Sequence, residues 1–378
     1  MKHFLLSTVL LSTASTFYAQ MKPLNATTHP KFQNSVPKLN QIRLSGSRVN
    51  VLEMAETKQW LGLIDSTTQK PLQTTVWGYG LAGSPTYPGP TLLAKSGVPV
   101  QVEWRNNLPQ IHLLPVDTSY HAAKPNLGIP TVTHLHGGHS ESASDGGPEA
   151  WYTSNYAETG AGFKQKVYNY QNDQEGANLW YHDHTLGLTR LNVYAGLIGF
   201  YKLTDANDKA LNLPNGDYDR ELIFQDKLFY ENGEKYYPSD APINTTAKHP
   251  SGLPEFFGDF ILVNGMIWPY MKVEPRQYRL RFVNASDARV YEFALSNGGS
   301  FMQIATDLGK LNKPAEKTKL SLAPGERAEI IIDFAKYAGQ KIQLLNHGPD
   351  GPYGNPTSPK SNPATTGQAM QFQVTLPF

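Results

Sequence analysis

The chain has 378 residues, enough for two domains with a substantial buried core, and its formal net charge of +1 includes no run of like charges. This balance gives no reason to expect a nucleic-acid partner or binding to an anionic membrane surface. Because the sequence contains no cysteine, it excludes disulfides, thiol nucleophiles, iron–sulfur clusters and any thiolate-bound copper within these residues.

The first 20 residues resemble a secretory signal peptide in composition. A short basic start is followed by the apolar run at residues 4–11 and a small-residue segment at 12–19, with cleavage expected after Ala14 or Ala19. The apolar run is too short to span a membrane. We therefore expect an exported protein, periplasmic or extracellular, and the alternative is an irregular N-terminal arm.

Short strand patterns joined by glycine- and proline-containing turns begin near residue 40. The clearest is residues 98–104, where apolar and polar side chains alternate. Residues 204–219 are polar and form the best linker candidate, after which the strand patterns start again. Because no long stretch has helical periodicity, the sequence predicts an all-β protein of two consecutive β-sandwich domains, at residues 40–204 and 216–378.

Two His-x-His motifs lie in strand-like sequence of the first predicted domain. They contain His134 and His136, and His182 and His184. Side chains alternate between the faces of a strand, so the two histidines of each motif point the same way, about 6.5 Å apart. Eleven histidines in 378 residues would give roughly 0.3 such pairs by chance, so two pairs favour a metal site over coincidence. Neutral imidazole is a common ligand of redox metals.

The chain resembles the multicopper oxidases, and within them the bacterial spore-coat laccase and bilirubin oxidase branch. The resemblance rests on the two histidine motifs together with YPGPT at 87–91, VEPRQYRLRFVNA at 273–285 and SLAPGER at 321–327. It implies that both domains are cupredoxin-like Greek-key sandwiches and that the family's third domain is missing. The charged residues of segment 273–285 are expected to form structural salt bridges.

The resemblance also implies a role for each histidine of the two motifs. In the family, a type 1 copper takes electrons from the substrate and a type 2/type 3 copper cluster reduces dioxygen to water. His134 resembles the type 2 ligand, and His136, His182 and His184 resemble type 3 ligands. Asp145 is a candidate proton donor, with an ordinary Asp-Gly turn as the alternative. The copper site would be incomplete, since the chain lacks the type 1 cysteine and a second set of four histidines.

Three functions remain open from the sequence. The first is a truncated or split laccase-like oxidase, active on small phenolic substrates only when a third domain, encoded separately or lost from this sequence, completes the site. Self-association through the apolar face left exposed by the missing domain is also expected. The second is a copper-binding protein without turnover, and the third is a copper-free structural relative. His139 is expected to lie outside the metal site. The remaining histidines without partners at ligand spacing are expected on the surface: His112, His121, His249 and His347.

Overall fold

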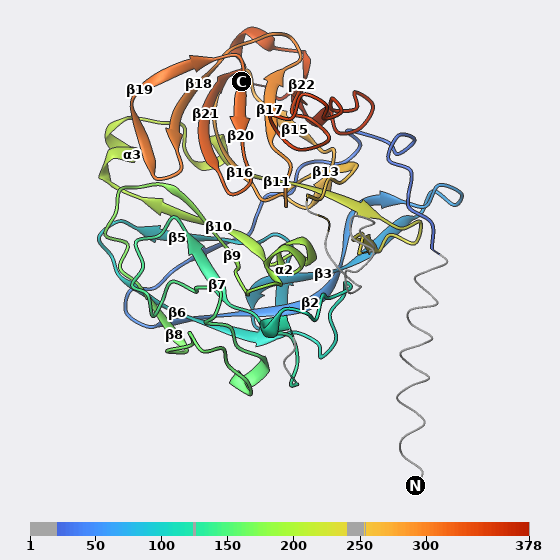
Figure 1. Ribbon diagram of the computed structural model, residues 1–378. Coiled ribbons are helices and arrows are strands. Elements are labelled where there is room, and N and C mark those ends of the chain that lie inside the picture. The colour runs from blue at the N-terminus through green and yellow to red at the C-terminus, as the bar shows by residue number, and fades with distance from the viewer. Residues whose placement is uncertain (1–20, 124–125, 240–252, 254, 378) are drawn as a thin grey trace.

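The computed structural model describes residues 21–123, 126–239, 253 and 255–377. The predicted signal peptide and His249 lie outside the described residues. Figure 1 shows two strand-rich bodies, one from the blue-to-green N-terminal half of the chain and one from the yellow-to-red C-terminal half. The structure is 44% strand and 7% helix, and the predicted all-β sandwich fold is confirmed.

The first sandwich has an aromatic core between two sheets. One sheet has the strand order β4 (Ser84–Thr86), β3 (Pro71–Leu81), β2 (Val49–Ile64), β6 (Val100–Asn107), β8 (Val167–Tyr170). The other has the order β1 (Gln41–Arg43), β5 (Gly89–Lys95), β10 (Ile198–Thr204), β9 (Asn178–Asp183), β7 (Thr133–His136). Trp104 from the first sheet packs on Tyr181 from the second, with ring centroids 5.2 Å apart. Strand β7 is at the edge of its sheet.

The second sandwich follows the same plan. One sheet has the order β14 (Met266–Ile267), β13 (Phe260–Val263), β11 (Asp219–Phe229), β16 (Gln277–Asn284), β21 (Arg327–Asp333), β18 (Phe301–Thr306), β19 (Gly309–Lys317), and β12 (Lys235–Tyr236) pairs with β11. The other has the order β15 (Tyr270–Val273), β23 (Gln368–Val374), β22 (Lys341–Asn346), β17 (Tyr291–Leu295), β20 (Leu320–Leu322). In β16, Leu280 and Phe282 enter the core, so Arg279 and Arg281 emerge from the opposite face.

Within the described residues, the helices are short and occupy connections between strands. They are the α-helices α2 (Thr189–Ala195) and α3 (Ala206–Ala210) and the 3-10 turns η1 (His121–Ala123), η2 (Ser154–Tyr156), η3 (Gly216–Tyr218) and η4 (Ala335–Tyr337). Helix α2 follows the second histidine motif closely, and α3 and η3 lie in the segment predicted as a linker. In the part of the chain that the structure describes, no helix is long and apolar enough to cross a membrane.

A buried group of charged and polar side chains, which we call the charged seam, joins the two sandwiches. Arg281 of β16 donates to both carboxylate oxygens of Asp219, at 2.6 and 3.0 Å, and to Glu329 at 2.7 Å. Its Nη1 also donates to the Asn178 side chain of the first sandwich, at 2.7 Å. Lys202 of β10 forms a further ion pair with Asp219. The salt bridges expected of segment 273–285 are therefore confirmed at Arg281.

Candidate metal centre

Strands β7 and β9 bring the two histidine motifs side by side. They pair antiparallel, with His134 opposite His182 and His136 opposite Trp180. Directly opposed residues of an antiparallel pair share one face of the sheet. The four rings are accordingly neighbours, with centroids 5.1 Å apart for His134 and His184, 5.4 Å for His136 and His182, and 5.6 Å for His134 and His182. We call these four residues the histidine quartet.

Hydrogen bonds to backbone carbonyls orient two of the rings. Nδ1 of His134 lies 2.6 Å from the Asp145 carbonyl oxygen, and Nδ1 of His182 lies 2.7 Å from the Asp183 carbonyl oxygen. A carbonyl oxygen only accepts, so each Nδ1 carries the hydrogen and each Nε2 keeps its lone pair. A hydrogen bond from the ring nitrogen that does not bind the metal is the usual way in which a protein orients a metal-binding imidazole.

One pair of nitrogens in the quartet has a separation that suits either a hydrogen bond or a shared metal ion. Nδ1 of His136 and Nε2 of His182 are 3.2 Å apart, and two imidazole nitrogens bound to one metal at about 2.0–2.1 Å also lie roughly 3 Å apart. Nδ1 of His184 is buried without a hydrogen-bond partner among the described residues. In that same part of the chain, no group of three or more His, Cys, Asp or Glu side chains is arranged to hold a single ion. The quartet is therefore not a closed four-ligand cage.

Burial keeps three of the four rings neutral, those of His134, His136 and His182. It lowers the pKa of His136 to about 4, with a further contribution from the nearby positive charge of Arg327. Burial also places the pKa of His182 well below its usual value and lowers that of His134. A metal ion binds only the unprotonated ring nitrogen. The three rings therefore need no deprotonation to accept a metal near pH 7.

Asp183 ties the two histidine strands together, although sequence reasoning did not single it out. Its carboxylate accepts hydrogen bonds from the backbone N–H of Val132 and of Thr185, both at 3.0 Å, from the Thr185 hydroxyl at 3.0 Å and from Asn192 at 2.9 Å. Burial raises the pKa of Asp183 to about 6. The sequence does contain a signal for Asp183, namely an acidic residue inside a buried strand. A buried carboxylate needs several hydrogen-bond donors around it.

The other candidate residues lie around the quartet. The Asp145 carboxylate is 3.6 Å from Nδ1 of His134, and its side chain is 39% exposed. His139 is 64% exposed and lies 3.4 Å from Asp173, away from the quartet. His121 and His347 are exposed, as expected.

The expectation that His112 lies free on the surface was wrong. Its ring packs edge-on against Trp77, with centroids 4.5 Å apart. The Leu114 backbone N–H donates to Nδ1 at 2.9 Å, so Nε2 carries the hydrogen and donates to the Asn192 side chain at 3.0 Å. Burial lowers the pKa of His112 to about 4. Trp77 and Asn192 are distant from His112 in sequence, which is why spacing alone did not reveal these two partners.

The metal-free chain should lose stability as the pH falls from about 6.5 to about 4, in part through His112. The folded-state pKa of about 4 lies below the ordinary value of about 6.5, so the unfolded chain binds protons that the folded ring does not. Denaturant unfolding at pH 6.5 and at pH 4.5 gives the loss of unfolding free energy between these two pH values. This loss should be about 1–2 kcal/mol smaller in His112→Phe than in the parent. An identical pH dependence in the variant and the parent would contradict the assignment.

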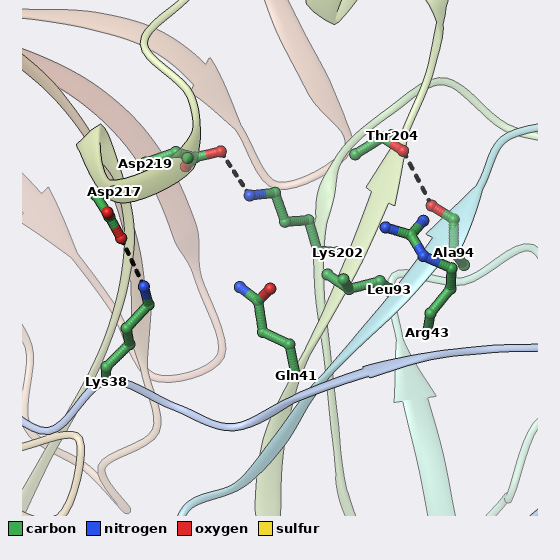
Figure 2. Close-up of a pocket in the computed structure, with 10 residues that line it drawn as sticks. Lys38, Gln41, Arg43, Leu93, Ala94, Lys202, Thr204, Asp217 and Asp219 are labelled. Atoms are coloured by element: carbon green, nitrogen blue, oxygen red, sulfur yellow. Dashed lines mark hydrogen bonds and ion pairs between the residues drawn. The ribbon is translucent and has the colours of Figure 1, made fainter.

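A separate pocket of about 370 Å3 lies along β1, β5 and β10 and contains no histidine. Figure 2 shows that its charged side chains largely face one another, with Lys38 paired to Asp217 and Lys202 paired to Asp219. The first pair joins the segment before β1 to η3, and the second joins β10 to the start of β11. The pocket is part of the junction between the sandwiches and does not touch the quartet.

Known proteins resemble the chain in sequence and in fold. A laccase from Bacillus subtilis is 47% identical over 311 residues, which cover 81% of this chain and 58% of the laccase. Multicopper oxidase LPR1 from Arabidopsis thaliana is 42% identical over 305 residues, covering 80% of this chain and 52% of that protein. The crystal structure of a multicopper oxidase variant from Aquifex aeolicus superposes with a TM-score of 0.68 at 25% identity, covering 91% of this chain and 66% of that one.

The chain thus spans about half the length of the curated relatives that it matches. No family model matches it.

Proposed function

We propose that this chain, which belongs to the multicopper oxidase family, binds copper through His134, His136, His182 and His184 and contributes them to a laccase-like oxidase site. The observation that carries the proposal is the 3.2 Å separation of Nδ1 of His136 and Nε2 of His182 on paired strands. Bound copper would supply one-electron chemistry, which takes electrons from a small phenolic substrate and passes them to dioxygen.

The chain's own residues would hold the ligands and manage protons. His136 and His182 would share one metal ion, and His134 and His184 would serve neighbouring ions of the same cluster. Trp180 packs on His182 with centroids 4.2 Å apart and on His136 at 5.2 Å, and so limits ring rotation and excludes water. The Asp145 carboxylate would pass a proton between solvent and the site, which its partial exposure and its 3.6 Å distance from His134 support.

Completion of the site requires ligands that these 378 residues do not contain. They include no cysteine for a type 1 copper, and His-x-His motifs occur only at the quartet. We infer that a third cupredoxin domain or a second copy of the chain would provide the remaining ligands. The signal-like composition of residues 1–20 supports export to the periplasm or beyond.

Copper titration of the purified full chain tests the metal assignment. Isothermal calorimetry with Cu(II), and with Zn(II) as competitor, should show saturable binding near neutral pH, and electron paramagnetic resonance should show nitrogen coordination. Absence of saturable binding, or a signal without nitrogen coupling, would contradict copper binding and favour a copper-free structural protein.

Oxygen uptake separates an oxidase component from a copper-binding protein without turnover. The copper-loaded chain alone should consume oxygen with a phenolic donor no faster than free copper, because no residue among the 378 can form the electron-accepting thiolate site. Rapid phenol oxidation by the chain alone would contradict the need for a partner. Activity that appears only when a complementary domain is added would support the oxidase role.

A further inference from the structure

Arg327 reaches from the second sandwich to the start of a histidine strand. It begins β21, and its side chain is only 2% exposed. Nε donates to the backbone carbonyl of Asn178, the first residue of β9, at 2.9 Å. Nη1 donates to the Gly325 carbonyl and Nη2 to the Asp307 carbonyl, both at 3.0 Å. Two hydrogen bonds to carbonyl oxygens thus hold the guanidinium on its own sandwich, and a third hydrogen bond joins it to β9.

The same guanidinium also lies against the end of the other histidine strand. Gly137 follows His136 directly and has φ +86°, a conformation that favours glycine. A methyl group added at Gly137 would overlap Nη2 of Arg327. The absence of a side chain at Gly137 therefore lets the turn after β7 approach the Arg327 guanidinium closely.

The turn that precedes Arg327 packs on a ring of the quartet. Gly325 has φ +83°, and a methyl group there would lie 3.2 Å from Cε1 of His136. The Gly325 N–H donates to the Asn284 carbonyl at 2.8 Å, which fixes the turn on β16. His136 is accordingly confined between this backbone turn on one side and Trp180 of its own sheet on another.

We propose that Arg327 is a positioning residue for the metal centre, by which the second sandwich holds the start of β9 and the turn after β7 and sets the orientation of His136. This inference rests on the proposed function, since it assigns how that site is held. Among the buried arginines described above, only Arg327 contacts β9 and also lies against the turn that follows β7. Lysine at this position has a single ammonium group, which cannot reproduce three hydrogen bonds in fixed directions.

Arg289 provides a matched control. It is also a buried arginine of the second sandwich, 1% exposed, with Nε 2.9 Å from Asp226 and Nη2 donating to the Gly258 carbonyl at 2.9 Å. None of its recorded contacts involves β7 or β9. Arg289→Lys should therefore reproduce the loss of stability without the loss of positioning.

The experiment compares Arg327→Lys and Arg289→Lys in the full chain. Both should lower the melting temperature, but only Arg327→Lys should weaken Cu(II) binding, by about 10-fold or more, as expected when the support of a metal ligand is lost. In the metal-free state, side-chain NMR of 15N-labelled histidine should show shifted His136 and His182 resonances in Arg327→Lys alone. Gly325→Ala, which keeps the guanidinium, should shift His136 and gives a second route should Arg327→Lys not fold.

Unchanged histidine resonances in both Arg327→Lys and Gly325→Ala, with copper affinity within twofold of the parent, would overturn the inference. Should the parent itself bind no copper, the proposed function fails. The metal-free resonances would still decide whether Arg327 positions His136, so the two failures are distinguishable.

Discussion

Replacing His136 and His182 together with alanine should lower the Cu(II) affinity of the chain by at least about 100-fold, since even the loss of groups that only support a metal ligand costs 10–100-fold. The double variant removes the two nitrogens that lie 3.2 Å apart and so deletes the best-formed pair of donors in the quartet. Calorimetric titration against the parent measures the change.

His139→Ala is the matched control for this result. His139 lies shortly after the end of β7, the strand that carries His136, yet its ring is 64% exposed and faces Asp173. Copper affinity should stay within about twofold of the parent, as expected for a surface residue that is no ligand. A double variant that still binds copper as tightly as His139→Ala would exclude the quartet as the copper site.

Arg281→Ala should lower the free energy of unfolding by about 3–5 kcal/mol, because removing one partner of a buried ion pair leaves the other charges without compensation. Arg281 is 2% exposed and pairs with Asp219 and Glu329, both also buried. It also holds the Asn178 side chain, so its loss should loosen the contact between the sandwiches. Equilibrium denaturation at constant pH gives the value.

A surface arginine gives the comparison. Arg105 pairs with Glu103 at 3.0 Å but is 52% exposed, so Arg105→Ala should cost less than about 1 kcal/mol. Equal losses in Arg281→Ala and Arg105→Ala would contradict a structural role for the charged seam.

The sequence predicted the local features of the fold well because those features follow from local patterns. Alternating apolar residues predicted strands such as residues 98–104, most of which lie in β6. The period of two along a strand also predicted that His134 and His136 share a face, as do His182 and His184. The lack of long stretches with helical periodicity predicted an all-β fold, and α2 and α3 are short helices in the connections between strands.

Pairing between distant strands could not be predicted in the same way. Nothing in the sequence sets His134 opposite His182, since register depends on the packing of whole sheets. The partners of Arg281 are likewise scattered over Asn178, Asp219 and Glu329. Arg327 was part of the SLAPGER segment that carried the family resemblance, but only the folded chain places its guanidinium against Gly137.

Anomalous diffraction at the copper edge, from crystals of the copper-loaded full chain, tests the central claim most directly. The account predicts a copper peak within the quartet, bonded at about 2 Å to Nδ1 of His136 and Nε2 of His182. A copper peak only at exposed histidines such as His121 or His347, or no peak among the four rings at saturating copper, would contradict it.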